Sequence, residues 1–153
     1  MKDYITIPYK KLVRYCLLQE RCVLELKNKM NLMQINNKDQ EKMLKNLITN
    51  DYINEERFSR SLARGKFKKN NWGKIKITYQ LKKKNISNEN INKGLKEIDE
   101  KEYNKTIDKL IEKKKKEIKS KTIFEKKGKI STFLIQKGFE REIVWEKINK
   151  SYK

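Results

Sequence analysis

The 153-residue sequence contains no histidine, one proline, five glycines and two cysteines. Without histidine, the chain lacks the commonest general base, the Ser-His-Asp and Cys-His arrangements, and every zinc site that needs imidazole. Two cysteines are too few for a four-thiolate metal site. The phosphate-cradling motifs G-x-G-x-x-G and G-x-x-x-x-G-K-[ST] are also missing. We therefore expect a protein that is not an enzyme and that binds no cofactor and no metal.

Long apolar runs are missing as well. No stretch approaches the roughly 18 apolar residues of a membrane span, and residues 1–10 carry Asp3 and no apolar signal core. We expect a cytoplasmic protein without a membrane partner, and a disulfide is disfavoured in that compartment. Cys16 and Cys22 would also lie about 120° apart on a continuous helix. Both are therefore predicted to be buried as small apolar residues.

Positive charge is in excess. Forty lysines and arginines face 20 acidic residues, which gives a formal net charge of +20. The 34 lysines against six arginines indicate an AT-rich coding sequence, but such a bias does not explain why basic residues outnumber acidic ones two to one. A polyanionic partner is the leading inference. Because only 36% of the residues are hydrophobic, a few small modules fit the chain better than a compact enzyme with one large core.

Few turn-forming residues and many helix formers predict an all-α protein. Phe58 and Leu62 illustrate the i, i+4 spacing of narrow apolar stripes, which recurs along the chain. Helix starts are expected at Asn37, Asn54 and Ser87, each followed by a suitable acidic or amide residue. The predicted helices span residues 10–18, 20–32, 38–50, 54–69, 73–84, 87–98, 100–119, 122–137 and 140–150.

The sequence also repeats itself after a shift of 53 residues. This shift places Lys74, Ile77, Leu81, Ile86 and Leu95 on Lys127, Ile130, Leu134, Phe139 and Ile148. The turn at residues 84–86 falls on residues 137–139, and both have the pattern of a helix end with a left-handed residue. A lysine- and isoleucine-rich helical chain can align with itself by chance, but the shared turn argues against chance. With a fainter copy upstream, we predict three tandem three-helix repeats, residues 1–51, 52–99 and 100–153.

The sharpest local signal is a stretch without acidic residues. Residues 57–84 hold 11 basic residues and no acidic one. Phe58, Phe67, Trp72 and Tyr79 lie among them, and basic residues interleaved with aromatics are typical of contacts to single-stranded nucleic acid. Phe58 has the spacing of a core residue. Whether Tyr79 is core or surface is left open, as are Phe67 and Trp72, which flank a predicted turn.

The polar side of the second repeat would therefore present cations of one sign to an acidic or phosphate-rich partner, with Trp72 as a stacking or anchoring side chain. The candidate contact residues are Arg57, Arg60, Arg64, Lys66, Lys68, Lys69, Trp72, Lys74 and Lys76. A second lysine run, residues 113–116, is bracketed by Glu112 and Glu117, so we interpret it as solvated surface. Acidic residues such as Asp99 fall at predicted helix starts, where capping explains them.

Several of these segments resemble the RecX family of regulatory proteins. The segments that resemble the central motif of that family are Glu55-Glu56-Arg57-Phe58-Ser59, Arg64, Trp72-Gly73-Lys74-Ile75-Lys76-Ile77, Leu81, Lys84-Asn85-Ile86 and Ile91. Its closing segment resembles Lys127, Ile130, Phe133-Leu134 and Lys137-Gly138-Phe139, and its first link resembles Asp51-Tyr52-Ile53. The resemblance runs from about Lys11 to Lys150. Asn85 stands where glycine is usual in the family, but asparagine also accepts a positive φ.

The resemblance implies an elongated, curved array of tandem three-helix repeats that binds the recombinase RecA and holds back its activity. The implied partners are single-stranded DNA and the RecA filament, in whose groove the protein would lie. The implied setting is recombination, DNA repair and the SOS response. The chain is expected to act as a monomer. A long cationic body could contact several filament protomers at once, which would compensate for weak individual ion pairs. The residues leave one alternative open, a basic DNA-binding protein of the nucleoid or helix-turn-helix type without a recombinase partner.

Overall fold

The computed structural model describes the backbone of residues 3–153 and the side chains from residue 6 onward, and this part of the chain is helical without strands. The prediction of an all-α protein is confirmed. The helices are α1 (Asp3–Leu18), α2 (Val23–Leu32), α3 (Asn37–Thr49), α4 (Glu55–Asn70), α5 (Lys74–Lys83), α6 (Asn88–Leu95), α7 (Glu100–Glu117), α8 (Ile123–Gln136) and α9 (Arg141–Ser151). None of the helices in the described residues combines the length and apolarity that crossing a membrane would require.

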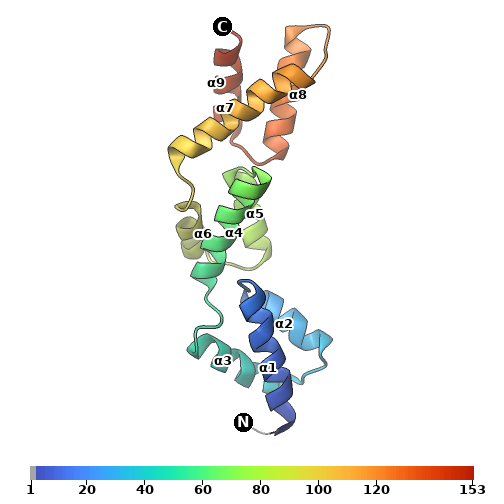
Figure 1. The fold of residues 1–153 in the computed structure, drawn as a ribbon, viewed down its shortest axis with the longest axis vertical. Coiled ribbons are helices and arrows are strands. Elements are labelled where there is room, and N and C mark those ends of the chain that lie inside the picture. The colour runs from blue at the N-terminus through green and yellow to red at the C-terminus, as the bar shows by residue number, and fades with distance from the viewer. Residues whose placement is uncertain (1–2) are drawn as a thin grey trace.

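The helices lie in three groups along the long axis of the molecule (Figure 1). We name these groups the first bundle (α1–α3), the central bundle (α4–α6) and the third bundle (α7–α9). The start of α1 and the connection between α7 and α8 lie at opposite ends of the molecule (Figure 1). The predicted elongated array of three-helix units is therefore confirmed, and it leaves each bundle with long exposed flanks.

The helix starts follow local capping chemistry. The side chains of Asn54, Ser87 and Asp99 each accept a hydrogen bond from the backbone N–H three residues ahead, as expected for N-cap residues. In α3 the cap is Asn36, whose side chain accepts from the N–H of Asp39, so the start predicted at Asn37 is displaced by one residue. Local sequence therefore fixes most of the helix boundaries.

The start predicted for the first helix is wrong. We expected this helix to begin at residue 10, after Pro8. Proline lacks an N–H, and within a helix its ring clashes with the preceding turn. In the structure α1 begins at Asp3 and contains Pro8. So close to a helix start, the proline has only one preceding turn to disturb. The other predicted boundaries differ from the observed ones by at most three residues.

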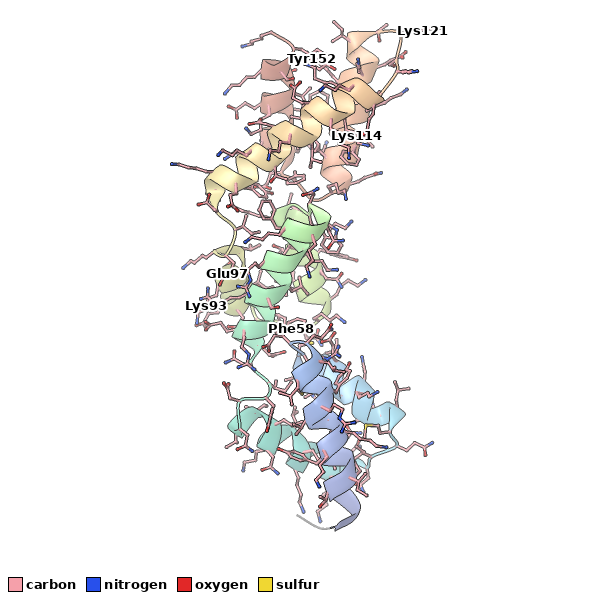
Figure 2. The ribbon with its side chains drawn as sticks, in the orientation of Figure 1. Phe58, Lys93, Glu97, Lys114, Lys121 and Tyr152 are labelled. Carbon is pink, nitrogen blue, oxygen red and sulfur yellow. The ribbon has the colours of Figure 1, made fainter. Side chains whose placement is uncertain are left out.

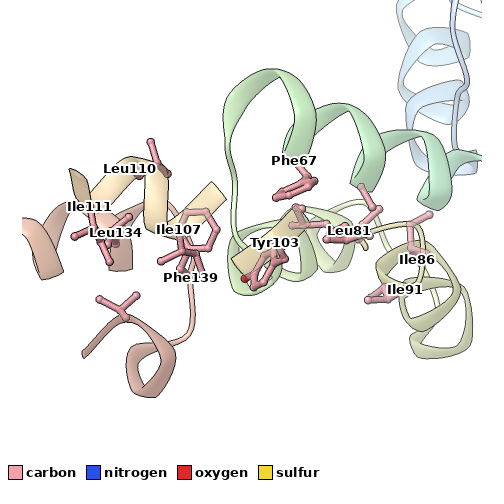
Figure 3. Packing of buried hydrophobic residues seen from close by; sticks show 14 of the residues in the cluster. Phe67, Leu81, Ile86, Ile91, Tyr103, Ile107, Leu110, Ile111, Leu134 and Phe139 are labelled. Atoms are coloured by element: carbon pink, nitrogen blue, oxygen red, sulfur yellow. The ribbon is translucent and has the colours of Figure 1, made fainter. Parts of the chain in front are cut away.

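The central and third bundles share one apolar core. The ring of Tyr103 lies between those of Phe67 and Phe139, with centroid separations of 5.7 and 5.3 Å, and Figure 3 shows the three rings between the two bundles. Phe67 is thus a core residue, and Phe58 is buried as predicted. The first bundle has a separate core that is built around Leu12, Leu26, Met30, Met43 and Leu47.

Both cysteines are free and buried, which confirms their prediction as apolar residues without a disulfide. Burial raises the pKa of the Cys16 thiol to about 11 and also raises the pKa of Cys22. Because the thiolate is the reactive form, burial disfavours nucleophilic reaction of both side chains.

The start of α5 is tied to the third bundle by main-chain hydrogen bonds. The N–H of Gly73 donates to the carbonyl of Lys137 at 2.7 Å, and the N–H of Ile75 donates to that of Gly138 at 3.0 Å. A Cβ atom at Gly73 would overlap the backbone of Gly138, which itself has a φ of 97°. The third bundle therefore satisfies the unpaired N–H groups at this helix start, and it fixes the turn that carries Trp72.

Candidate nucleic-acid interface

The eight predicted cations do not form a surface of one sign, which corrects the expectation from the sequence. Four of them form ion pairs with carboxylates: Arg57, Arg60, Arg64 and Lys74. Within the described part of the chain, the other four form none: Lys66, Lys68, Lys69 and Lys76. The charge of the first group is largely balanced by carboxylates of the protein, whereas the second group has no such partner; Lys68 and Lys69 are exposed, and Lys66 and Lys76 are half-buried.

Arg57 links the first bundle to the central bundle. Its Nε donates to Glu20 at 2.7 Å, and its Nη1 donates to Asp51 at 3.0 Å. Its Nη2 donates to the backbone carbonyl of Asp51 at 2.9 Å. The hydrogen bond to Glu20 is the main reason that the pKa of Arg57 is raised. A partner would have to displace these bonds before it could use this guanidinium.

Arg60 and Arg64 belong to a network between α4 and α6. Arg60 contacts Glu56 at 3.1 Å and Glu97 at 3.2 Å, and Arg64 contacts Glu97 at 3.4 Å. Lys93 closes the network, since its Nζ lies 3.1 Å from Glu56; its hydrogen bond and that of Arg60 lower the pKa of Glu56. Figure 2 shows Lys93 and Glu97 together on the α6 side of the central bundle. This face has mixed charge.

Lys74 is also committed to contacts within the protein. Its Nζ pairs with Glu100 and lies 4.8 Å from the ring centroid of Tyr103. Its backbone N–H donates to the hydroxyl of Tyr103 at 2.9 Å, and that hydroxyl donates to Glu140. Lys74 therefore strengthens the contact between the central and third bundles.

Two of the unpaired lysines lie over the ring of Trp72. The Nζ atoms of Lys66 and Lys76 lie 4.8 and 4.5 Å from the centroid of its ring, within the range of a cation–π contact. The half-buried indole packs against the shared core. The backbone N–H of Trp72 donates to the carbonyl of Lys66 at 3.1 Å. Because the protein's own lysines cover this ring, its geometry suits the holding of two ammonium groups better than the stacking of a base.

A cleft of about 370 Å³ adjoins these lysines, between α4, α5 and the end of α1. Lys66 and Lys69 line it without a carboxylate partner among the described residues. Its two acidic residues are already engaged, because Glu20 pairs with Arg57 and Glu25 pairs with Lys84.

We name Lys66, Lys69, Trp72 and Lys76 the Trp72 cluster. Lys68 is exposed but lies about 100° around α4 from Lys69, outside this cluster.

No feature of the sequence indicated that Lys137 extends this region from the third bundle. Its Nζ donates to the backbone carbonyl of Asn70 at 3.0 Å, next to the turn that carries Trp72. Lys137 and Lys114 also lie 5.9 and 4.1 Å from the ring centroid of Phe133. Since 67 residues separate Asn70 from Lys137 in the chain, no local charge pattern could have placed them together.

Comparison with known proteins shows which family models the sequence matches. A family model described as the second three-helix domain of RecX matches residues 54–95, and one described as its third three-helix domain matches residues 96–148. Together these matches cover more than half of the chain. No curated protein matches the sequence.

Two solved structures have a similar fold. The crystal structure of RecX from Lactobacillus salivarius is 24% identical, with a TM-score of 0.85, and the match covers 98% of this chain and 97% of that chain. A crystal structure described as regulatory protein RecX is 21% identical, with a TM-score of 0.83, and the match covers 93% of this chain and 71% of that chain. At these identities the likeness establishes the fold over nearly the whole chain.

Proposed function

The chain belongs to the RecX family of regulatory proteins, and from this premise we propose that it binds the RecA filament on single-stranded DNA and inhibits the recombinase. Family membership supports a RecA-regulating function in general and places the chain in a regulatory family rather than an enzyme family. The more specific proposal depends on the distribution of charge along the rod.

The Trp72 cluster is the observation that carries this proposal. Lys66, Lys69 and Lys76 make no ion pair among the described residues, so a phosphate can approach them without displacing a carboxylate. Release of the counterions around a DNA strand then favours binding. Arg57, Arg60 and Arg64 differ because each would have to exchange an existing ion pair for a new one.

The shape of the molecule supports contact with a filament. Three bundles in one row present separate surfaces along a single long axis (Figure 1). When several weak contacts form on one body, each further contact is intramolecular and the overall affinity rises well above that of a single contact. We therefore propose that a monomer of this protein spans more than one filament protomer.

The test is DNA strand exchange by RecA in the presence of substoichiometric amounts of this protein. We expect inhibition by the wild type and clearly weaker inhibition by a triple variant, Lys66→Gln with Lys69→Gln and Lys76→Gln. Let K be the binding constant for the DNA strand. Loss of three phosphate contacts would make the negative slope of log K against log salt shallower by roughly 2. The matched control is Lys101→Gln with Lys105→Gln and Lys109→Gln, which removes three exposed α7 lysines that form no ion pair in the described residues.

Three results would count against the proposal. Strand exchange that is unchanged by the wild-type protein would reject RecA inhibition. Equal inhibition by the wild type and the Lys66, Lys69 and Lys76 variant would move the contact away from the Trp72 cluster. Equal affinity for bare and RecA-coated single strands would favour the alternative, a basic DNA-binding protein without a recombinase partner.

A further inference from the structure

The end of the molecule opposite the start of α1 exposes an apolar pair. Residues 118–122 connect α7 to α8, and Ile123 and Phe124 form the first turn of α8. Their exposed fractions are 61% and 87%, and Phe124 makes no ring contact with any described residue. Figure 2 shows Lys121 at the outermost part of this connection. We name residues 116–129 the distal tip.

The distal tip and the residues that lead into it carry strong positive charge. Residues 113–129 contain nine lysines and two glutamates, and of these glutamates only Glu117 forms ion pairs in the described residues. Glu117 lies 3.1 Å from Lys114 and 3.9 Å from Lys113, and Glu125 accepts the hydroxyl of Ser120 at 2.7 Å. Among the side chains of residues 6–153, the lysines of the tip that form no ion pair are Lys116, Lys119, Lys121, Lys126, Lys127 and Lys129.

This pairing also bears on the lysine run that precedes the tip. Lys113 and Lys114 pair with Glu117, and Lys115 lies 3.8 Å from Glu112. Three of the four lysines are thus partly balanced, but the side chains of Lys114 and Lys115 are only 24% exposed, which corrects our interpretation of the whole run as solvated surface. The unbalanced charge lies beyond it, around Phe124.

The exposed ring of Phe124 differs from the other aromatic rings of the third bundle. Lys114 lies 4.1 Å from the centroid of Phe133, and Lys115 lies 4.4 Å from that of Tyr152, so both rings are already covered by lysines. In the central bundle, lysines cover Trp72 in the same way. A bare ring on a lysine-rich segment favours a partner with both an aromatic face and negative charge.

Alignment of the repeats shows that this pair is not part of the repeated core. The shift of 53 residues places Ile123 and Phe124 on Asn70 and Asn71, which lie at the polar end of α4 in the central bundle. Apolar residues at this position therefore fill no core site that the repeat requires. Their presence needs an explanation outside the folding of the third bundle.

We propose that the distal tip is a separate binding site for single-stranded nucleic acid, in which Phe124 stacks on a base and the tip lysines contact the flanking phosphates. A single strand offers both groups at once, because its bases are exposed and its phosphates alternate with them. In a duplex the base faces are already stacked on one another, so the ring would have no surface to contact. The site lies at one end of the rod, away from the Trp72 cluster.

The experiment measures binding of the full-length protein to a labelled oligothymidylate and to an abasic strand of the same length, without recombinase. Phe124→Ala should weaken binding to the thymidylate by about five- to 150-fold, the range found for loss of one stacked base. Binding to the abasic strand should not change. Phe124→Trp should retain the affinity, and Ile123→Ala is the matched control that removes neighbouring apolar surface without removing a ring.

The lysines are tested separately. Lys119→Gln with Lys121→Gln and Lys126→Gln should weaken binding to both strands and lower the salt slope by roughly 2, because phosphates are common to both strands. Circular dichroism checks that each variant keeps the helix content of the wild type.

The proposal is overturned if Phe124→Ala binds the thymidylate as tightly as the wild type, or if it loses the same affinity for the abasic strand. A tip that serves an acidic protein partner would give the first of these results. Because no recombinase is present and the Trp72 cluster is unchanged, failure here would leave the proposed regulation of RecA standing on its own test.

Discussion

The two junctions between neighbouring bundles are held by different interactions. Between the central and third bundles, the ring of Tyr103 lies in a shared apolar core, and the N–H of Gly73 donates to the carbonyl of Lys137. Between the first and central bundles, ion pairs supplement a smaller apolar contact. Arg57 pairs with Glu20, and the first bundle contributes Cys22 to the shared core.

From this difference we predict that the chain combines a rigid joint with a more adjustable one. Apolar burial and main-chain hydrogen bonds hardly respond to salt, so the central and third bundles should move as one body. Partly exposed ion pairs contribute about 0 to 1 kcal/mol each and are screened by salt. The side chains of Arg57 and Glu20 are 37% and 29% exposed, so the joint of the first bundle belongs to this weaker class.

The largest effect is expected from a methyl group at the rigid joint. Gly73→Ala places a Cβ atom against the backbone of Gly138 and Phe139, so it should lower the free energy of unfolding by about 3 kcal/mol. Urea denaturation followed by the fluorescence of Trp72 and Trp145 measures this change. Gly65→Ala is the control, because its Cβ would meet no atom of the described residues and alanine favours the helix by about 0.5 to 1 kcal/mol. Equal stability of the two variants would contradict this view of the joint.

A smaller effect is expected from the hydroxyl of Tyr103. At neutral pH, Tyr103→Phe should cost about 1 to 2 kcal/mol, since the N–H of Lys74 and the carboxylate of Glu140 lose a hydrogen-bond partner. Urea denaturation at a series of pH values measures both this cost and its dependence on ionisation.

The pH dependence has a defined sign. Burial is the main cause that raises the pKa of Tyr103 above its ordinary value of 10.0, so the folded protein keeps a proton that the unfolded chain releases. Its contribution to stability is therefore complete below pH 10.0 and falls as the pH rises above that value. The difference in stability between the wild type and Tyr103→Phe should narrow in that alkaline range. A constant difference would show that the phenol ionises equally in both states.

The smallest effect on stability is expected at the joint of the first bundle. Arg57→Gln should change the free energy of unfolding of the central and third bundles by less than about 1 kcal/mol, because the ion pairs it removes are partly exposed. It should nevertheless broaden the distribution of overall dimensions in small-angle X-ray scattering at low salt. In the wild type, the same broadening should appear only at high salt.

The matched control for that experiment is Arg14→Gln, which removes an exposed arginine of α1 that forms no ion pair with the side chains of residues 6–153. It should behave as the wild type at every salt concentration. Scattering curves of Arg57→Gln that match those of the wild type at low salt would mean that apolar contacts, and not ion pairs, hold the first bundle.

Local features of the sequence were sufficient for the helices and their ends. Asn54 and Ser87 cap the helices that follow them, and Asn85 has the positive φ of 59° that its alignment with Gly138 predicted. These features depend on residues a few positions apart, so they can be recognised without a fold. Pro8 was the exception, because the cost of a proline depends on how many turns precede it.

The candidate site was predicted less completely, for a physical reason. The acid-free stretch predicted a face of one sign, but Glu97 pairs with Arg60 from 37 positions away. Lys137 reaches the same region from the next bundle. Charge balance depends on which side chains the fold brings within a few ångströms, and the order of charges along the chain does not contain that information.

The sequence by itself determined a helical, modular and strongly basic protein, because helix propensity, capping and net charge are properties of residues and their near neighbours. Only the tertiary structure decided which cations stay unpaired, which aromatic rings lysines cover and which ring stays bare. Phe124 and Trp72 show the difference: both are aromatic residues close to lysines in the sequence, but only Trp72 is packed against the core. That distinction arises from packing between distant segments, which decides what each side chain can still contact.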